Sequence, residues 1–144
     1  MTAAFYDVFI SHAYEDKNEF SSRLALQLKK KGLKIWYFGL ELKLGDSIAA
    51  SVNYALKNAS FGIVFISPVY FELQWAMNEL EELFSEEERL GRIFPVLHGV
   101  SAEMISARLP VLTGRLFVST GKGMQNVVRR VLQAVTDKKI RGGK

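Results

Sequence analysis

Trp75 and Glu79 are the two residues of this sequence whose types and spacing could carry chemistry. They stand four positions apart, so on a helix they are neighbours on one face. A separate apolar stripe is formed by Leu73, Ala76, Met77, Leu80, Leu83 and Phe84. An indole ring beside a carboxylate, just past a buried strand, predicts a ligand site at the carboxyl edge of an α/β sheet. The alternative is that Trp75 packs under a loop and Glu79 lies on a solvated face.

Alternating strands and helices are predicted along the whole chain, and these elements must position the pair. Apolar and β-branched runs predict strands over 6–10, 34–38, 61–66, 92–97 and 115–118. Helical spacing predicts helices over 16–31, 46–57, from 68 to about 84 and over 124–135, with at most a short helix in 101–114. This order predicts an α/β fold with a parallel sheet. In a flavodoxin-like strand order, 2-1-3-4-5, the crevice lies between the first and third strands, with Ser11, His12 and Ser67 at its mouth.

Composition predicts one globular domain over residues 1–138, followed by a basic disordered tail over 139–144. The chain has 144 residues, is 49% hydrophobic and carries a net charge of +4. Seven of its glutamates lie between Glu72 and Glu88, and seven lysines or arginines lie from Lys122 onward. The tail could be read as a nucleic-acid arm, but no aromatic residues are interleaved in it, so no nucleic-acid partner is expected.

The absence of cysteine excludes disulfides and thiol catalysis, and two isolated histidines predict no metal site. No signal peptide or long apolar run is present, so we expect a cytoplasmic protein without a membrane partner. Several enzyme motifs are also missing: a dinucleotide-binding glycine fingerprint, a P-loop and a hydrolase nucleophile elbow. Ser67 ends the third strand, where a receiver domain would carry its phosphoacceptor aspartate.

Three ordered blocks of the sequence resemble the Toll/interleukin-receptor (TIR) domain of bacterial type. The first runs from Asp7 through Ser11-His12-Ala13 and resembles the family's first strand and loop. The second, Ile35-Trp36-Tyr37 followed by Leu42-Lys43-Leu44-Gly45-Asp46-Ser47, resembles its second strand and the so-called BB loop. The third, Ile63–Ser67 followed by Trp75-Ala76-Met77-Asn78-Glu79, resembles its third strand and W-x-x-x-E helix. Together the blocks span about residues 5 to 84.

The resemblance implies the flavodoxin-like fold, a three-layer sandwich whose five-stranded parallel sheet has helices on both faces. Many members are enzymes that cleave NAD+ at the nicotinamide–ribose bond, giving nicotinamide and ADP-ribose or a cyclic isomer, often in bacterial defence signalling. NAD+ is then the substrate, and no cofactor is implied. Glu79 takes the catalytic position. The implied substrate-binding residues are Ser11, His12, Ala13, Trp36, Phe38 and Trp75. The implied assembly loop, over 39–46, docks on other TIR domains and includes Leu42, Lys43, Leu44, Gly45 and Asp46.

The sequence departs from the family pattern after the second strand, where Phe38 and Gly39 replace a common acidic and a common polar residue. Substrate fit, product or assembly could therefore differ. An alternative function is a non-catalytic TIR adaptor that mediates TIR–TIR association, or a virulence factor that interferes with a host. If Glu79 lies exposed beside Trp75, its replacement by alanine should change stability by about 0.5 kcal/mol or less.

Overall fold

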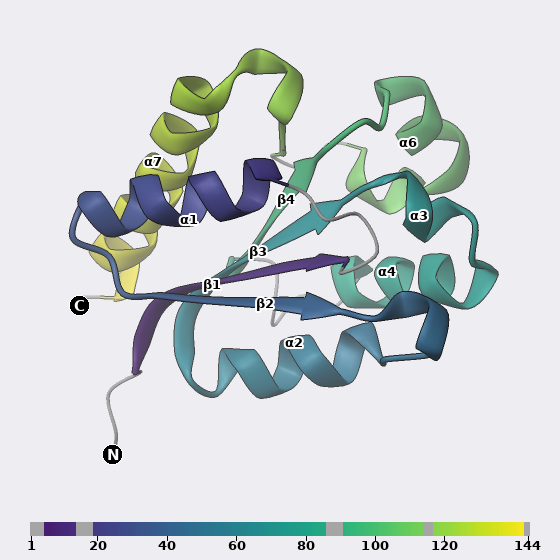
Figure 1. The fold of residues 1–144 in the computed structure, drawn as a ribbon, viewed down its shortest axis with the longest axis horizontal. Coiled ribbons are helices and arrows are strands. Elements are labelled where there is room, and N and C mark those ends of the chain that lie inside the picture. Colours follow the sequence, from purple (N-terminus) through teal and green to yellow (C-terminus); the bar gives the residue numbers. More distant parts are fainter. Residues whose placement is uncertain (1–4, 14–18, 86–90, 114–116, 143–144) are drawn as a thin grey trace.

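Five parallel strands form one sheet in the order β2-β1-β3-β4-β5, with helices on both faces (Figure 1). The computed structural model describes residues 5–13, 19–85, 91–113 and 117–142. The strands are β1 (Tyr6–Ala13), β2 (Ile35–Leu40), β3 (Ala59–Ile66), β4 (Ile93–Leu97) and β5 (Val118–Ser119). The predicted strand order and α/β class are confirmed.

The helices alternate with the strands along the chain. They are α1 (Glu19–Lys30), α2 (Ile48–Leu56), α3 (Pro68–Phe71), α4 (Gln74–Ser85), α6 (Ala102–Arg108) and α7 (Met124–Gly142), with single 3-10 turns η2 (Leu42–Leu44), η3 (Pro110–Leu112) and η4 (Thr120–Lys122). The predicted helix from 68 to about 84 is divided into α3 and α4 at Glu72 and Leu73. The last helix continues to Gly142, past residue 138, where the sequence predicts the domain to end.

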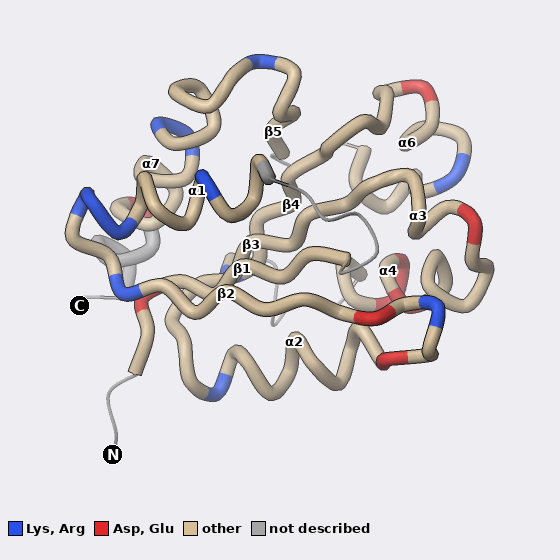
Figure 2. Tube along the Cα trace, in the orientation of Figure 1, with Lys and Arg blue, Asp and Glu red and all other residues tan. Residues whose placement is uncertain are grey.

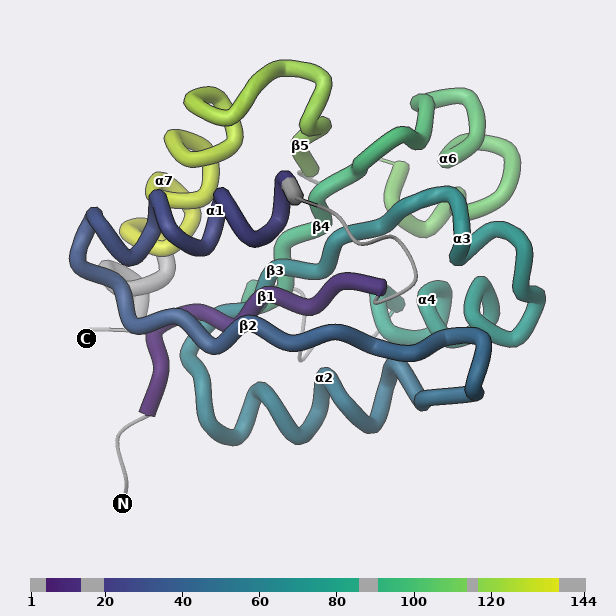
Figure 3. Tube along the Cα trace, in the orientation of Figure 1, coloured from purple at the N-terminus to yellow at the C-terminus, as the bar shows by residue number. Residues whose placement is uncertain are grey.

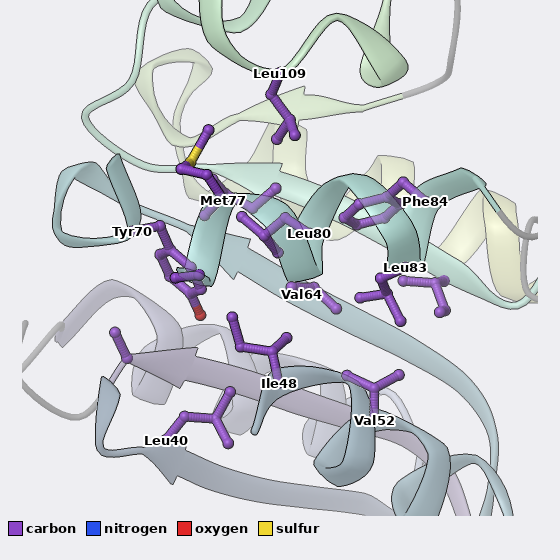
Figure 4. Packing of buried hydrophobic residues seen from close by; sticks show 14 of the residues in the cluster. Leu40, Ile48, Val52, Val64, Tyr70, Met77, Leu80, Leu83, Phe84 and Leu109 are labelled. Carbon is purple, nitrogen blue, oxygen red and sulfur yellow. The ribbon is translucent and has the colours of Figure 1, made fainter. Parts of the chain in front are cut away.

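Each face of the sheet has its own buried cluster, because side chains alternate along a strand. Phe9, Leu40 and Val64 lie on the face covered by α2, α3, α4 and α6. Val8, Ile10 and Ile63 lie on the opposite face, covered by α1 and α7. Figure 4 shows the first face, where Leu40, Ile48 and Tyr70 converge on one region of the cluster.

The apolar stripe predicted for α4 is the side that faces this first cluster. Ala76, Met77, Leu80, Leu83 and Phe84 are all buried there. Trp75 and Glu79 are half-buried, off the stripe as predicted. The core packing of α4 therefore fixes where the Trp75 and Glu79 side chains lie.

Charged residues are unevenly distributed over the described chain (Figure 2). Many of the basic residues lie along α1 and α7, while acidic residues lie around α3, α4 and the loop between β2 and α2. Lys29 and Lys30 lie in the last turn of α1, where cations interact favourably with the free carbonyls of a helix end. Within the described ranges, no helix is long and apolar enough to span a bilayer.

Candidate active site

Glu79 lies on α4 with its carboxylate against the first turn of α2. Its Oε1 accepts a hydrogen bond from the backbone N–H of Ala49 at 2.8 Å. The hydroxyl of Ser47 donates to the same oxygen at 3.3 Å. Within the described residues Oε2 has no hydrogen-bond partner. One carboxylate oxygen is therefore held by α2, and the other retains its full capacity to accept hydrogen bonds.

The start of α2 attracts a carboxylate because the first N–H groups of a helix have no partner within it. Ser47 is the N-cap residue, and its Oγ accepts the N–H of Ala50 at 3.1 Å. The helix predicted to begin at residue 46 therefore begins after Ser47. Asp46 instead closes the preceding loop, since its Oδ2 accepts the N–H of Glu41 at 2.9 Å.

The loop from Glu41 to Asp46 connects β2 directly to α2 (Figure 3). Gly45 turns it with a φ of 88°, a left-handed conformation that favours glycine. Leu42 is fully buried, whereas Leu44 is 78% exposed. Two of the three leucines between residues 39 and 46, Leu40 and Leu42, pack in the core beside α2 and are not available for the predicted association with other TIR domains. Leu44 is the exposed leucine of this loop.

Trp36 and Phe38 lie on the same sheet face as Glu79, on the edge strand β2. Their ring centroids are 5.3 Å apart, and Tyr54 of α2 meets Trp36 edge-on at 5.8 Å. Trp75 also packs against this face from the first turn of α4. All three predicted aromatic residues are half-buried.

The end of β1 divides the predicted first-loop residues between the two faces. Ala13 packs in the Glu79-side cluster, and strand alternation places Ser11 on the same side. The Ser11 Oγ is buried without a hydrogen-bond partner among the described residues. His12 points the other way, and its ring stacks on Tyr37 at 4.6 Å. The structure thus brings Ser11 and Ala13 to the face of Glu79 but not the His12 ring.

Sequence reasoning missed the contacts of Ser47 and Ala49 with Glu79. The capping signal at Ser47 is visible in the sequence, but the 32-residue separation from Glu79 gives no local sign that they meet. Ser67, predicted at the crevice mouth, occupies the N-cap position of α3, where its side chain makes no capping hydrogen bond.

Named proteins similar to this chain include enzymes that act on NAD+ or form cyclic ADP-ribose. The "NAD(+) hydrolase TcpA" of Theionarchaea archaeon (strain DG-70-1) is 39% identical over 142 residues, covering 97% of this chain and 43% of that protein. The "NAD(+) hydrolase PdTIR" of Paracoccus denitrificans is 34% identical, covering 92% and 45%. The "2' cyclic ADP-D-ribose synthase BtTIR" of Bacteroides thetaiotaomicron is 37% identical, covering 80% and 40%. The chain spans less than half the length of these relatives.

Solved structures of TIR domains share the fold. The TIR domains of the activated Roq1 resistosome superpose with a TM-score of 0.59 at 22% identity, covering 89% of this chain and 98% of theirs. A metazoan TIR-STING receptor from C. gigas in complex with 2',3'-cGAMP gives a TM-score of 0.63 at 16% identity, covering 94% of this chain and 41% of that one. The family model of the TIR domain matches residues 8–132, and the chain belongs to the TIR domain family.

Proposed function

We propose that this TIR domain cleaves the nicotinamide–ribose bond of NAD+, with Glu79 as the catalytic carboxylate. The observation that carries the proposal is the placement of Glu79. Its carboxylate is half-buried and held through Oε1, and Oε2 has no partner among the described residues. The names of the relatives, NAD+ hydrolase and cyclic ADP-ribose synthase, support the same reaction.

The reaction requires stabilisation of positive charge more than it requires an acid. When the bond between ribose C1′ and the pyridinium nitrogen breaks, its electron pair neutralises that nitrogen, and nicotinamide leaves uncharged. Positive charge then develops over C1′ and the ring oxygen of the ribose, as in glycoside cleavage. A carboxylate held at a fixed distance lowers the energy of this state. Glu79 supplies such a carboxylate, and its Oε2 can also bind ribose hydroxyls.

The product depends on what attacks C1′. Water that adds to C1′ and loses a proton gives ADP-ribose, whereas attack by another group of the same molecule gives a cyclic isomer. The similar proteins bear both kinds of name. A cyclic product would be a diffusible signal, and a role in bacterial defence signalling is the biological part of this proposal.

The substrate would lie on the side of the sheet that α4 covers, next to Glu79. Trp36, Phe38 and Trp75 present partly exposed aromatic surface there. The buried Ser11 hydroxyl lies on the same side, and its oxygen needs a hydrogen-bond partner that the described residues do not supply. The His12 ring faces away, so its share of the site would be the backbone at the end of β1.

Nicotinamide release from NAD+ by the purified chain tests the proposal directly. Glu79→Gln keeps the size of the side chain and an acceptor oxygen for Ala49, but removes the negative charge. We expect its rate to fall by about 10²–10³-fold. Glu82→Gln is the matched control, because Glu82 is an exposed glutamate of the same helix, and it should keep full activity. Equal activity in the two variants would contradict the assignment.

We also propose that the chain associates with other TIR domains through the loop over 39–46. Leu44 favours this, because a leucine that is 78% exposed at the tip of a closed, glycine-turned loop contributes little to packing among the described residues. Lys43 and Gly45 flank it, and Asp46 maintains the loop closure. This association would also be the function of the domain if it acted as an adaptor.

A further inference from the structure

The contact between Glu79 and α2 joins two segments that are distant in the sequence into one hydrogen-bonded network. The hydroxyl of Ser47 accepts from Ala50 and donates to Glu79, and the N–H of Ala49 donates to Glu79 as well. The Ser47 hydroxyl and the Ala49 N–H both donate to the same oxygen, Oε1 of Glu79. The network therefore restrains the rotation of the carboxylate and leaves Oε2 as the oxygen that a ligand would meet.

We propose that Ser47 is a positioning residue for Glu79, holding the carboxylate at the start of α2 in the orientation needed for cleavage. This inference rests on the proposed function and names a residue that acts through Glu79. A group displaced by about 1 Å can lose about 100-fold in rate, so a single lost restraint at the carboxylate is enough to matter. Ser47 has no need to touch the substrate in this role.

Ser47 also ties Glu79 to the loop that precedes α2. Asp46 closes that loop on Glu41 through its side chain and through its backbone N–H, which donates to the Glu41 carbonyl at 3.3 Å. Ser47 is the next residue in the chain. A change in the conformation of the loop would therefore move Ser47, and with it the hydrogen bond to the Glu79 carboxylate. Association with another TIR domain at Leu44 could change the activity at Glu79 in this way.

A simpler role for Ser47 is to cap α2 without any effect on Glu79. One substitution distinguishes this capping role from the positioning role. Aspartate caps helices as well as serine does, because its carboxylate accepts the same backbone N–H. At position 47, however, it places a negative charge beside Oε1 of Glu79, where serine supplies a donor at 3.3 Å. Ser47→Asp therefore keeps the cap and removes the restraint on Glu79.

We expect Ser47→Asp to lower kcat by at least about tenfold, measured well below its unfolding temperature, with a smaller change in KM. Its thermal midpoint should fall below that of the wild type, because the carboxylates at positions 47 and 79 repel each other. Ser47→Thr keeps the hydroxyl and should restore kcat to within about threefold, since threonine is also an N-cap residue. Ser101→Asp is the matched control: Ser101 caps α6 through the N–H of Met104 at 3.1 Å and lies outside the site, so activity should not change. Wild-type kcat in Ser47→Asp would overturn the proposal.

A second measurement needs no catalysis. The Ala49 amide proton, bonded to a carboxylate in the wild type, should resonate downfield in a proton–nitrogen NMR spectrum and move upfield in both Ser47→Gly and Glu79→Ala. Glycine is an N-cap residue that brings no carboxylate of its own to Ala49, so an unmoved Ala49 amide in Ser47→Gly would overturn the positioning role. Failure of the wild type to release nicotinamide from NAD+ would instead overturn the proposed function, so the two failures are distinguishable.

Discussion

The ring of Phe9 fills the space that a side chain at Gly62 would occupy on the neighbouring strand. Phe9 and Gly62 are paired in register on β1 and β3, and a Cβ at position 62 would overlap the ring. Phe9 is fully buried and packs on Phe38 with ring centroids 5.8 Å apart. Gly62 therefore determines where an aromatic ring behind the proposed substrate surface can lie.

We expect Gly62→Ala to destabilise the fold, because the added methyl group must displace Phe9 within a packed core. Overpacking of this kind costs about 1–3 kcal/mol. Urea unfolding measures the loss, and Gly121→Ala is the control, since a Cβ there meets nothing closer than the Ser119 Oγ at 3.4 Å. If Gly62→Ala unfolds at the wild-type urea concentration, the Phe9 ring does not depend on this glycine.

Much of the fold could be predicted from the sequence because the signals are local. The apolar run from Phe61 to Ile66 indicates a strand buried on both faces, which β3 is. The stripe ending at Leu83 and Phe84 indicates the buried side of α4. In both cases the prediction depends only on the sequence of one segment and not on how distant segments pack together.

The site was less predictable, because its geometry depends on which helix covers which face. Alternation along β1 separates the side chains of His12 and Ser11, but the sequence does not say that α4 lies on the side of Ser11. The contact between Ser47 and Glu79 likewise exists only after α2 and α4 pack side by side. The expectation of an exposed Glu79 fails for this reason.

Glu79→Ala should therefore cost more stability than the sequence alone suggests. The Glu79 carboxylate accepts a hydrogen bond from the Ala49 N–H at 2.8 Å, so the alanine variant leaves this N–H of α2 without its acceptor. We expect a loss of about 1 kcal/mol, and less in Glu79→Gln, which retains an acceptor. Chemical denaturation of both variants checks the order. An Ala variant as stable as the wild type would show that water replaces the carboxylate without cost.

Arg92, which directly precedes β4, is expected to stabilise the amino-terminal end of the sheet without affecting catalysis. Its guanidinium donates to the carbonyls of Leu56, Ala59 and Ser60, and burial lowers the pKa of Arg92 below its usual value. Arg92→Ala leaves these carbonyls without that donor and should cost roughly 1–3 kcal/mol. Its specific activity well below the unfolding temperature should match the wild type. A selective loss of kcat in a fully folded variant would contradict this separation.

Association through Leu44 should make specific activity depend on protein concentration. We expect nicotinamide release per molecule to rise with concentration in the wild type. In Leu44→Glu it should remain flat, because the added charge opposes burial of the loop tip. Leu26→Glu on α1 is the control, as Leu26 is another exposed leucine, at 57%. Equal concentration dependence in both variants, with unchanged mass by light scattering, would exclude Leu44 from the contact.

Trp75 lies where its ring can influence the choice of product. Trp75 is half-buried and packs against the cluster around α4, so Trp75→Ala should cost less than the roughly 3–5 kcal/mol of a fully buried tryptophan. Cyclisation requires the adenosine half of the substrate to fold back and water to be excluded from C1′. The indole ring, one helical turn before Glu79, offers a flat surface for that folded form.

Trp75→Ala should therefore shift any cyclic product toward linear ADP-ribose or lower the rate of nicotinamide release. Trp75→Phe keeps a flat aromatic face and should lie nearer the wild type, whereas Trp75→Leu keeps apolar bulk without that face and should behave as the alanine variant does. Chromatography of the products separates the linear and cyclic forms. If all three variants keep the wild-type product ratio and rate, the ring of Trp75 serves packing alone, and the aromatic surface that orders the substrate must come from Trp36 and Phe38.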